Sequence, residues 1–309
     1  MTTRREFLAS SAFLLVGSGM PAALAAPLIT SKSPRRLTRV IEGAPTLEGA
    51  GVRLKRVIGQ PRLRLLDPFI LLDRFHSADP ADYRRGFPSH PHRGFETITV
   101  MLAGRMKHKD SRGNEGIIGG GGIQWMTAGR GIIHSEMPEG DNGLMSGFQF
   151  WLNLPAREKM RAPEYNDMQR ADIPAVSLNG RGDAQIIAGR ALGKTGAVDG
   201  RTTEPTLLTV NLEDDSPLAI DTPRGHTAFI FVHRGEVFIE GQRVPAGFIG
   251  VLSDGDRITL RAQTMRSGLI VATAKPLREP IVQRGPFVMN SEAEIRQAWE
   301  DYRSGALAR

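Results

Sequence analysis

The chain has 309 residues and a formal charge of +7, and 40% of its residues are hydrophobic. This composition allows one large or two modest cores and excludes wholesale disorder. Because the chain has no cysteine, disulfides, thiolate metal sites and cysteine nucleophiles are excluded, and any metal site must use nitrogen and oxygen ligands. The basic residues are scattered along the chain, so we expect a solvated surface and no nucleic acid partner.

The N-terminus has the pattern of an export signal. Arg4 and Arg5 precede a bulky apolar pair, as in Tat signals, and residues 23–25 form an A-x-A cleavage site. The apolar run between them is too short to span a bilayer securely. We therefore expect a Tat signal over residues 1–25, cleavage after Ala25 and a periplasmic mature protein without a stable membrane span. The protein stays cytoplasmic if the signal is not used.

The remaining chain predicts strands, with a helix only at the end. Residues 27–45 are basic and are expected to form an irregular lead-in. The later strands are expected from short apolar runs between turn residues, at 97–102, 145–154, 227–232, 236–240, 247–252, 257–260 and 267–273. Ser291 and Glu294 have capping-box spacing before a helix that reaches Tyr302. The pattern favours two antiparallel barrels or sandwiches, with a boundary near residues 168–175.

Two short motifs carry the candidate chemistry. His90 and His92 are two residues apart, and Pro91 keeps His90 extended, so both imidazoles point to the same face. His134 and Glu136 repeat this spacing. If the two segments lie side by side, three imidazoles and a carboxylate converge, a donor set that suits Fe(II) and also binds Mn, Ni, Co, Cu or Zn.

Other residues compete with this ligand set. Glu96 shares the phase of His90 and His92 and is a rival carboxylate, although Gly94 can host a bulge that shifts the register. His76 and His108 stand alone in the sequence. His226 and His233 are seven residues apart and would face opposite sides of a continuous strand, so we expect the second half to bind no metal.

These motifs resemble those of the pirin family. The matching stretches are residues 87–97 and 124–137, with shorter matches at 67–70, 73–75 and 285–290. The resemblance runs from about residue 37 to 304. It implies an all-β fold of two stacked cupin barrels, of the jelly-roll or double-stranded β-helix type, with a short C-terminal helix. The expected domains are a metal-binding N-terminal cupin over 37–168 and a metal-free C-terminal cupin over 175–304.

The resemblance also implies a ligand set and an activity. The ligands are His90, His92, His134 and Glu136, with iron in the first barrel only, which decides against Glu96. Several family members oxidise quercetin, cleaving the flavonol ring with O₂ and releasing carbon monoxide. Others are transcriptional co-regulators that respond to the oxidation state of iron, a role that the export signal argues against.

The resulting hypothesis is an Fe(II)-dependent dioxygenase of the quercetinase type, acting as a monomer on a flavonol or related polyphenol and O₂. Glu136 would take the proton of the substrate hydroxyl. Phe95, Gln124 and Trp125 would either line the pocket or pack in the core. The alternatives are a non-catalytic iron-binding, redox-sensing interaction protein and an isomerase or other small-molecule cupin enzyme.

Overall fold

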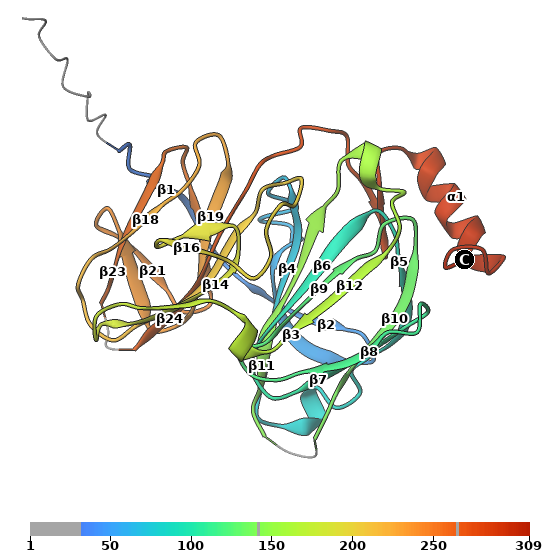
Figure 1. Ribbon diagram of the computed structural model, residues 1–309, viewed down its shortest axis with the longest axis horizontal. Helices are drawn as coiled ribbons and strands as arrows, with labels where there is room; N and C mark the ends of the chain where they lie inside the picture. Colours follow the sequence, from blue (N-terminus) through green and yellow to red (C-terminus); the bar gives the residue numbers. More distant parts are fainter. Residues whose placement is uncertain (1–31, 141–142, 264–265) are drawn as a thin grey trace, which may run out of the picture. The chain divides into compact units, whose positions relative to one another are not determined.

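The computed structural model describes residues 32–140, 143–263 and 266–309, which belong to one compact unit starting at Lys32. The expected export signal lies outside the described residues. Two barrels, each built from a seven-stranded and a four-stranded antiparallel sheet, follow one another along the chain (Figure 1). The prediction of an all-β fold with a short C-terminal helix is therefore confirmed.

The first barrel supplies most of the blue and green strands in Figure 1. In spatial order, its larger sheet contains β12 (Glu164–Met168), β9 (Ile123–Thr127), β6 (Phe95–Ala103), β11 (Met145–Asn153), β4 (Phe69–Ser77), β3 (Val52–Ile58) and β2 (Ala44–Glu48). Its smaller sheet contains β5 (Phe87–His92), β10 (Ile132–Pro138), β7 (Met106–Asp110) and β8 (Glu115–Ile118).

The second barrel has the same plan. Its larger sheet contains β1 (Leu37–Glu42), β22 (Phe248–Leu252), β19 (Thr227–Arg234), β24 (Ser267–Ala274), β17 (Thr206–Leu212), β14 (Gly182–Ala188) and β13 (Ala175–Ser177). Its smaller sheet contains β18 (Leu218–Asp221), β23 (Arg257–Ala262), β20 (Glu236–Ile239) and β21 (Gln242–Pro245). A short ribbon of β15 (Arg190–Ala191) and β16 (Lys194–Thr195) is attached to it.

Alternate side chains of a strand point to opposite faces of the sheet, and in β6 both faces are covered by other parts of the protein. In β6, Ile98 and Val100 point into a core cluster that also contains Phe229 and Ile270 of the second barrel. Thr99, in the opposite phase, points into the first barrel and donates a hydrogen bond to Glu136. Because both faces of β6 are covered, the strand is an almost uninterrupted run of buried residues.

The two barrels differ in what fills them. The interior of the second barrel is a cluster of aliphatic side chains, among them Ile186, Leu208, Ile230, Ile258 and Leu269. The first barrel has a smaller apolar cluster and leaves room for polar side chains beside it.

The expected irregular lead-in is wrong for residues 37–45. Strand β1 pairs with β22, and β2 pairs with β3. Leu37 and Ile41 are buried, and Arg35 just before them is 1% exposed and bonded to carbonyl oxygens of the second barrel. The basic composition suggested an exposed segment, because arginine is rarely buried unless its hydrogen-bond donors are satisfied.

The ends of the described chain are exchanged between the barrels. Strand β1 lies in the second barrel although it falls within the range expected for the first domain. The segment after residue 280 returns to the first barrel as a hairpin, β25 (Val282–Arg284) and β26 (Phe287–Met289), followed by helix α1 (Glu292–Arg303). Ser291 caps α1 as predicted. No helix among the described residues has the length and apolarity needed to cross a membrane.

Candidate metal centre

Three histidines meet at one end of the first barrel. His90 and His92 lie on β5 and His134 on β10, and the antiparallel pairing of these strands places His134 opposite His90. One nitrogen of each imidazole can be chosen so that all three lie within 4.8 Å of one another. We call these residues the three-histidine cluster. The structure thus brings together three of the four predicted ligands.

The tautomers of His90 and His92 are set by carbonyl groups. The Nδ1 atom of His90 lies 2.8 Å from the Pro88 carbonyl oxygen, and Nδ1 of His92 lies 3.3 Å from that of Pro286. A carbonyl only accepts, so each Nδ1 donates a hydrogen and each neutral ring keeps a lone pair on Nε2. The two Nε2 atoms lie 3.0 Å apart. Lone pairs that face each other at this distance suit a shared cation, so the residues fit a bound metal.

Burial supports the same protonation state. His92 and His134 are 2% and 1% exposed, and the Nε2 atom of His134 is buried without a hydrogen-bond partner among the described residues. Burial, followed by the charges of the neighbouring histidines, lowers the pKa of both imidazoles well below 6.5. Neutral imidazole is the form that binds metals.

A fourth histidine, His108, lies behind His134. Nδ1 of His134 lies 3.5 Å from Nδ1 of His108, and Nε2 of His108 lies 3.2 Å from a carboxylate oxygen of Asp110. If His134 donates from Nδ1, His108 accepts at Nδ1 and donates from Nε2 to Asp110. This arrangement leaves Nε2 of His134 free for a ligand. Tyr165 stacks on the His108 ring with centroids 4.4 Å apart and holds it in place.

Glu136 lies near the cluster but outside it. It follows His134 by two residues on β10, where the pairing with β5 shifts in register between these positions. Its carboxylate accepts hydrogen bonds from Thr99 Oγ1 at 2.8 Å and from Gln149 Nε2 at 3.1 Å. The structure therefore holds Glu136 at the pocket wall, and the metal-ligating group among the described residues contains only the three histidines.

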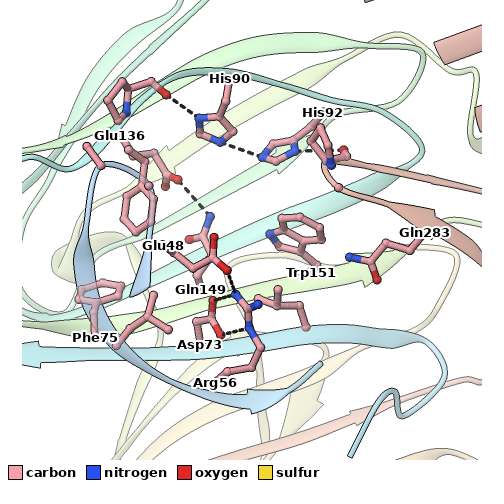
Figure 2. A pocket seen from close by; sticks show the side chains of 18 residues that line it. Glu48, Arg56, Asp73, Phe75, His90, His92, Glu136, Gln149, Trp151 and Gln283 are labelled. Atoms are coloured by element: carbon pink, nitrogen blue, oxygen red, sulfur yellow. Dashed lines mark hydrogen bonds and ion pairs between the residues drawn. The ribbon is translucent and has the colours of Figure 1, made fainter. Parts of the chain in front are cut away.

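A pocket of 820 Å³, which we call the barrel pocket, opens in front of His90 and His92. Leu54, Leu71, Phe75, Phe87 and Trp151 supply its apolar wall. Figure 2 shows the side chains of Gln149 and Glu136 facing this space, with an ion cluster at the far end. There Arg56 binds Asp73 at 2.7 Å and Glu48 at 2.8 Å.

The C-terminal segment closes one side of the barrel pocket. Gln283, Gly285 and Pro286 line it, and Val288 of β26 donates a backbone hydrogen bond to Arg93, the residue that follows His92. Arg93 also forms an ion pair of 2.7 Å with Asp301 of α1. The environment of His92 therefore depends on residues almost 200 positions away in the sequence.

None of the remaining candidates lines the barrel pocket, although the Phe95 ring lies edge-on to the His92 ring with centroids 5.1 Å apart. Glu96 points to the outer face of the large sheet, where it accepts a hydrogen bond from Thr127 and lies 3.5 Å from Arg201. Gly94, with φ of +91°, breaks the alternation between His92 and Glu96, so the shared phase does not persist. Phe95 and Trp125 are fully buried in core clusters, and Gln124 lies beside Tyr165 and Asp167.

Several contributors had no signal in the sequence. Thr99 and Gln149 are ordinary polar residues within apolar strands, and Pro286 acts through its backbone carbonyl. His108 stands alone in the sequence, and only the pairing of β7 with β10, which sets it opposite Glu136, brings it to His134.

The comparisons with known proteins agree with this architecture. A family model described as pirin matches residues 51–152, and one for the pirin C-terminal cupin domain matches residues 207–308. A Pseudomonas aeruginosa protein named as a proposed quercetin 2,3-dioxygenase is 47% identical over 273 residues, covering 86% of this chain and 95% of that protein. Human pirin is 40% identical over 279 residues, covering 88% and 93%.

Solved structures share the fold. The crystal structure of a quercetin 2,3-dioxygenase from Acinetobacter baumannii has a TM-score of 0.83 and 31% identity, and the match covers 89% of this chain and 99% of that one. A nickel(II) complex of a bacterial pirin from Escherichia coli has a TM-score of 0.61 at 20% identity, covering 77% and 99%. The fold is therefore a double cupin, and the chain belongs to the pirin family.

Proposed function

We propose that this chain is a metal-dependent dioxygenase of the quercetinase type that uses Fe(II) and cleaves a flavonol or related polyphenol with O₂. The observation that carries the proposal is the set of three imidazoles with one nitrogen of each within 4.8 Å of the others, two of which form part of the wall of a pocket large enough for such a substrate. The similarity to quercetin dioxygenases supports it.

The three-histidine cluster would hold the metal, and Glu136 is the proposed fourth ligand. Nitrogen and oxygen donors without thiolate suit Fe(II), and they also bind Mn, Ni, Co, Cu and Zn. When bound, the metal supplies a Lewis acid and, if it is iron, redox chemistry toward O₂.

The pocket residues would bind and orient the substrate. Pockets for small molecules usually measure about 300–1,000 Å³, and the barrel pocket, at 820 Å³, falls in this range. Phe75 and Trp151 offer flat apolar surfaces to an aromatic ring system. Glu48 and Arg56, at the opposite end from His90, offer a carboxylate and a guanidinium to the outer hydroxyl groups of a polyphenol.

Glu136 is placed to take the proton of the reacting hydroxyl. It lies two residues from His134 and lines the same pocket as His90. Thr99 and Gln149 each donate to one of its oxygens, which fixes the carboxylate plane and leaves lone pairs for a further partner. A carboxylate held within reach of the hydroxyl acts as a general base.

Oxygen uptake and carbon monoxide release with quercetin test the proposal. We expect the purified protein to contain metal, to consume O₂ with quercetin, to lose activity on chelation and to regain it with Fe(II). His134→Ala should lose metal and turnover together, whereas the exposed control His76→Ala should keep both. Turnover that survives complete metal removal would refute the mechanism.

The same assay separates the alternatives. Full metal occupancy without O₂ uptake across a panel of polyphenols would favour a non-catalytic, redox-sensing interaction protein. Isomerisation of a substrate without O₂ uptake would favour another cupin enzyme.

We further propose that the mature protein is periplasmic and monomeric. The twin arginines and the A-x-A site of residues 1–25 support export. Replacing Arg4 and Arg5 with lysine should retain the protein in the cytoplasm, as measured by cell fractionation, and arrival in the periplasm would contradict export by Tat. Light scattering of the purified protein tests the monomer.

A further inference from the structure

A second cavity lies on the other face of the sheet that lines the barrel pocket. It measures 430 Å³, and its walls come from β2, β3 and β4 of the first barrel, β19 of the second barrel and the turn before β22. We call it the junction cavity. Its titratable lining residues are all basic, with no carboxylate among them: Arg53, Lys55, Arg74, His76 and His233.

Arg74 is the centre of this cavity. It is 8% exposed, its Nη1 atom donates to the Phe75 carbonyl and to Ser146 Oγ, and its guanidinium lies over the Phe148 ring at 5.2 Å. Within the described ranges, no carboxylate lies within 4.0 Å of it, and its Nε and Nη2 atoms have no hydrogen-bond acceptor. A buried cation without a counter-charge is unfavourable unless something supplies one.

Arg56, on the opposite face of the same sheet, is paired with a carboxylate, unlike Arg74. The register sets Arg56 beside Asp73, and the next row sets Lys55 beside Arg74. Arg56 makes a two-pronged contact with Asp73, at 2.9 and 2.7 Å. The row facing the barrel pocket therefore carries its own anion, whereas the row facing the junction cavity carries two cations.

The other basic residues surround the space in front of Arg74. Lys55 lies 3.7 Å from Glu42, and Arg53 lies 2.9 Å from Asp82, so both are partly neutralised at the rim. Burial, followed by the charge of Arg74, lowers the pKa of His233 to about 3, so His233 is neutral. His233 therefore offers hydrogen bonds without adding a charge.

We propose that the junction cavity binds a small oxyanion of the phosphate or carboxylate class through Arg74, with Lys55 and Arg53 at the rim. The planar guanidinium presents its free Nε and Nη2 donors in a fork that matches two oxygens of such a group. The cavity is larger than an inorganic phosphate, so it has room for a small metabolite that carries this group. This site is separate from the three-histidine cluster, because the large sheet stands between them.

Titration calorimetry of the purified protein with inorganic phosphate, sulfate and citrate, at constant ionic strength set with chloride, tests the proposal. We expect saturable binding of one anion per chain. Arg74→Gln should weaken binding by at least about tenfold, the loss expected for one charge-assisted contact. Arg84→Gln, which removes an exposed arginine outside the cavity, should bind as the wild type does.

A second variant keeps the proposal testable if Arg74→Gln does not fold. Ala246 is exposed at the cavity wall, so Ala246→Glu brings a carboxylate to the cavity without disturbing the core. It should abolish anion binding and leave the circular dichroism spectrum unchanged. The proposal is overturned if no anion binds the wild type, if Arg74→Gln and Ala246→Glu both bind normally, or if Arg84→Gln weakens binding as much as Arg74→Gln.

Discussion

His108 acts on the site through another residue. It lies 3.5 Å from His134 on one side and 3.2 Å from Asp110 on the other, and it is fully buried. In the tautomer in which His134 donates from Nδ1, His108 accepts this hydrogen at its own Nδ1 and so keeps the lone pair of His134 on Nε2. Partners of this kind usually change metal affinity about 10–100-fold when they are removed.

The first prediction concerns His108. His108→Ala should weaken metal binding about 10–100-fold, whereas His108→Asn, whose amide oxygen can take the place of Nδ1, should recover part of the loss. Competition with a chelator measures the affinity without an activity assay, and His76→Ala is the control. Equal affinities for the alanine and asparagine variants would mean that His108 only fills space.

The second prediction separates proton transfer from metal binding at Glu136. Glu136→Gln keeps the shape of the side chain but removes its basicity. We expect turnover with quercetin to fall roughly 10²–10⁴-fold, the usual worth of a general base, while the three histidines retain metal. Steady-state O₂ uptake and metal analysis of the same sample check this, and full activity would exclude Glu136 as the base.

At the scale of elements, the hairpin of β25 and β26 completes the site from a distance. Gly94 lies directly beneath it, and a Cβ at this position would lie 2.0 Å from the Val288 carbonyl oxygen. Lys159 fastens the same contact, since its Nζ atom donates to Gly94 O, Asn153 Oδ1 and Val288 O. The chain thus uses one glycine and one buried lysine to hold Pro286 against His92.

The third prediction tests this close approach. Gly94→Ala should lower the free energy of unfolding by more than about 3 kcal/mol. The backbone at Val288 must move away from the new Cβ, and the alanine must also adopt a strained positive φ. Gly113 has a similar φ of +87° but nothing within 4 Å of its would-be Cβ, so Gly113→Ala should cost only about 1 kcal/mol. Chemical denaturation compares the two, and equal losses would show that packing against Val288 is unimportant.

The fourth prediction is a pH dependence at Lys159. Burial lowers its pKa from 10.5 to about 8, so between these values the unfolded chain binds more protons and stability should rise with pH. Lys159→Met removes this rise of stability with pH and leaves three oxygen acceptors unpaired. We expect its free energy of unfolding to be about 2–4 kcal/mol lower than that of the wild type at pH 7. The gap from wild type should widen between pH 8 and 10.5.

Denaturation at pH 7.5, 9 and 10.5 measures that gap. Lys194→Met, which removes an exposed lysine, is the control and should run parallel to the wild type. A constant gap for Lys159→Met would mean that Lys159 keeps its ordinary pKa when the chain is folded.

For the whole molecule, the sequence was informative where local pattern decides the structure. Runs such as 145–154 and 227–232 became strands because alternation and apolar content suffice there. The HxH spacing also predicted that His90 and His92 share a face. Long-range contacts could not be predicted from the sequence. No local pattern shows that Arg35 bonds to carbonyl oxygens of residues 223–253, or that His92 bonds to the carbonyl oxygen of Pro286.

The shared core makes the two barrels depend on each other. Phe69 and Phe148 of the first barrel contact Phe229 and Phe231 of the second, with ring centroids 4.9 and 5.7 Å apart. All three tryptophans lie in the first barrel or in the helix packed on it: Trp151 and Trp299 report on that half, whereas Trp125 belongs to the shared core, where the guanidinium of Arg201 lies over its ring at 5.6 Å. A perturbation confined to the second barrel can therefore be followed in the first.

The fifth prediction uses Arg35, whose guanidinium donates to Thr222 Oγ1 and to three carbonyl oxygens of the second barrel. Arg35→Met leaves these acceptors unpaired and should cost roughly 3 kcal/mol. Because the common core couples the barrels, the tryptophan transition should fall by roughly 6–12 °C as well, in step with circular dichroism. Arg36→Met, an exposed neighbour of equal charge, should leave both unchanged. A tryptophan transition that stays in place while the circular dichroism transition moves would show that the barrels unfold independently despite the aromatic contacts between them.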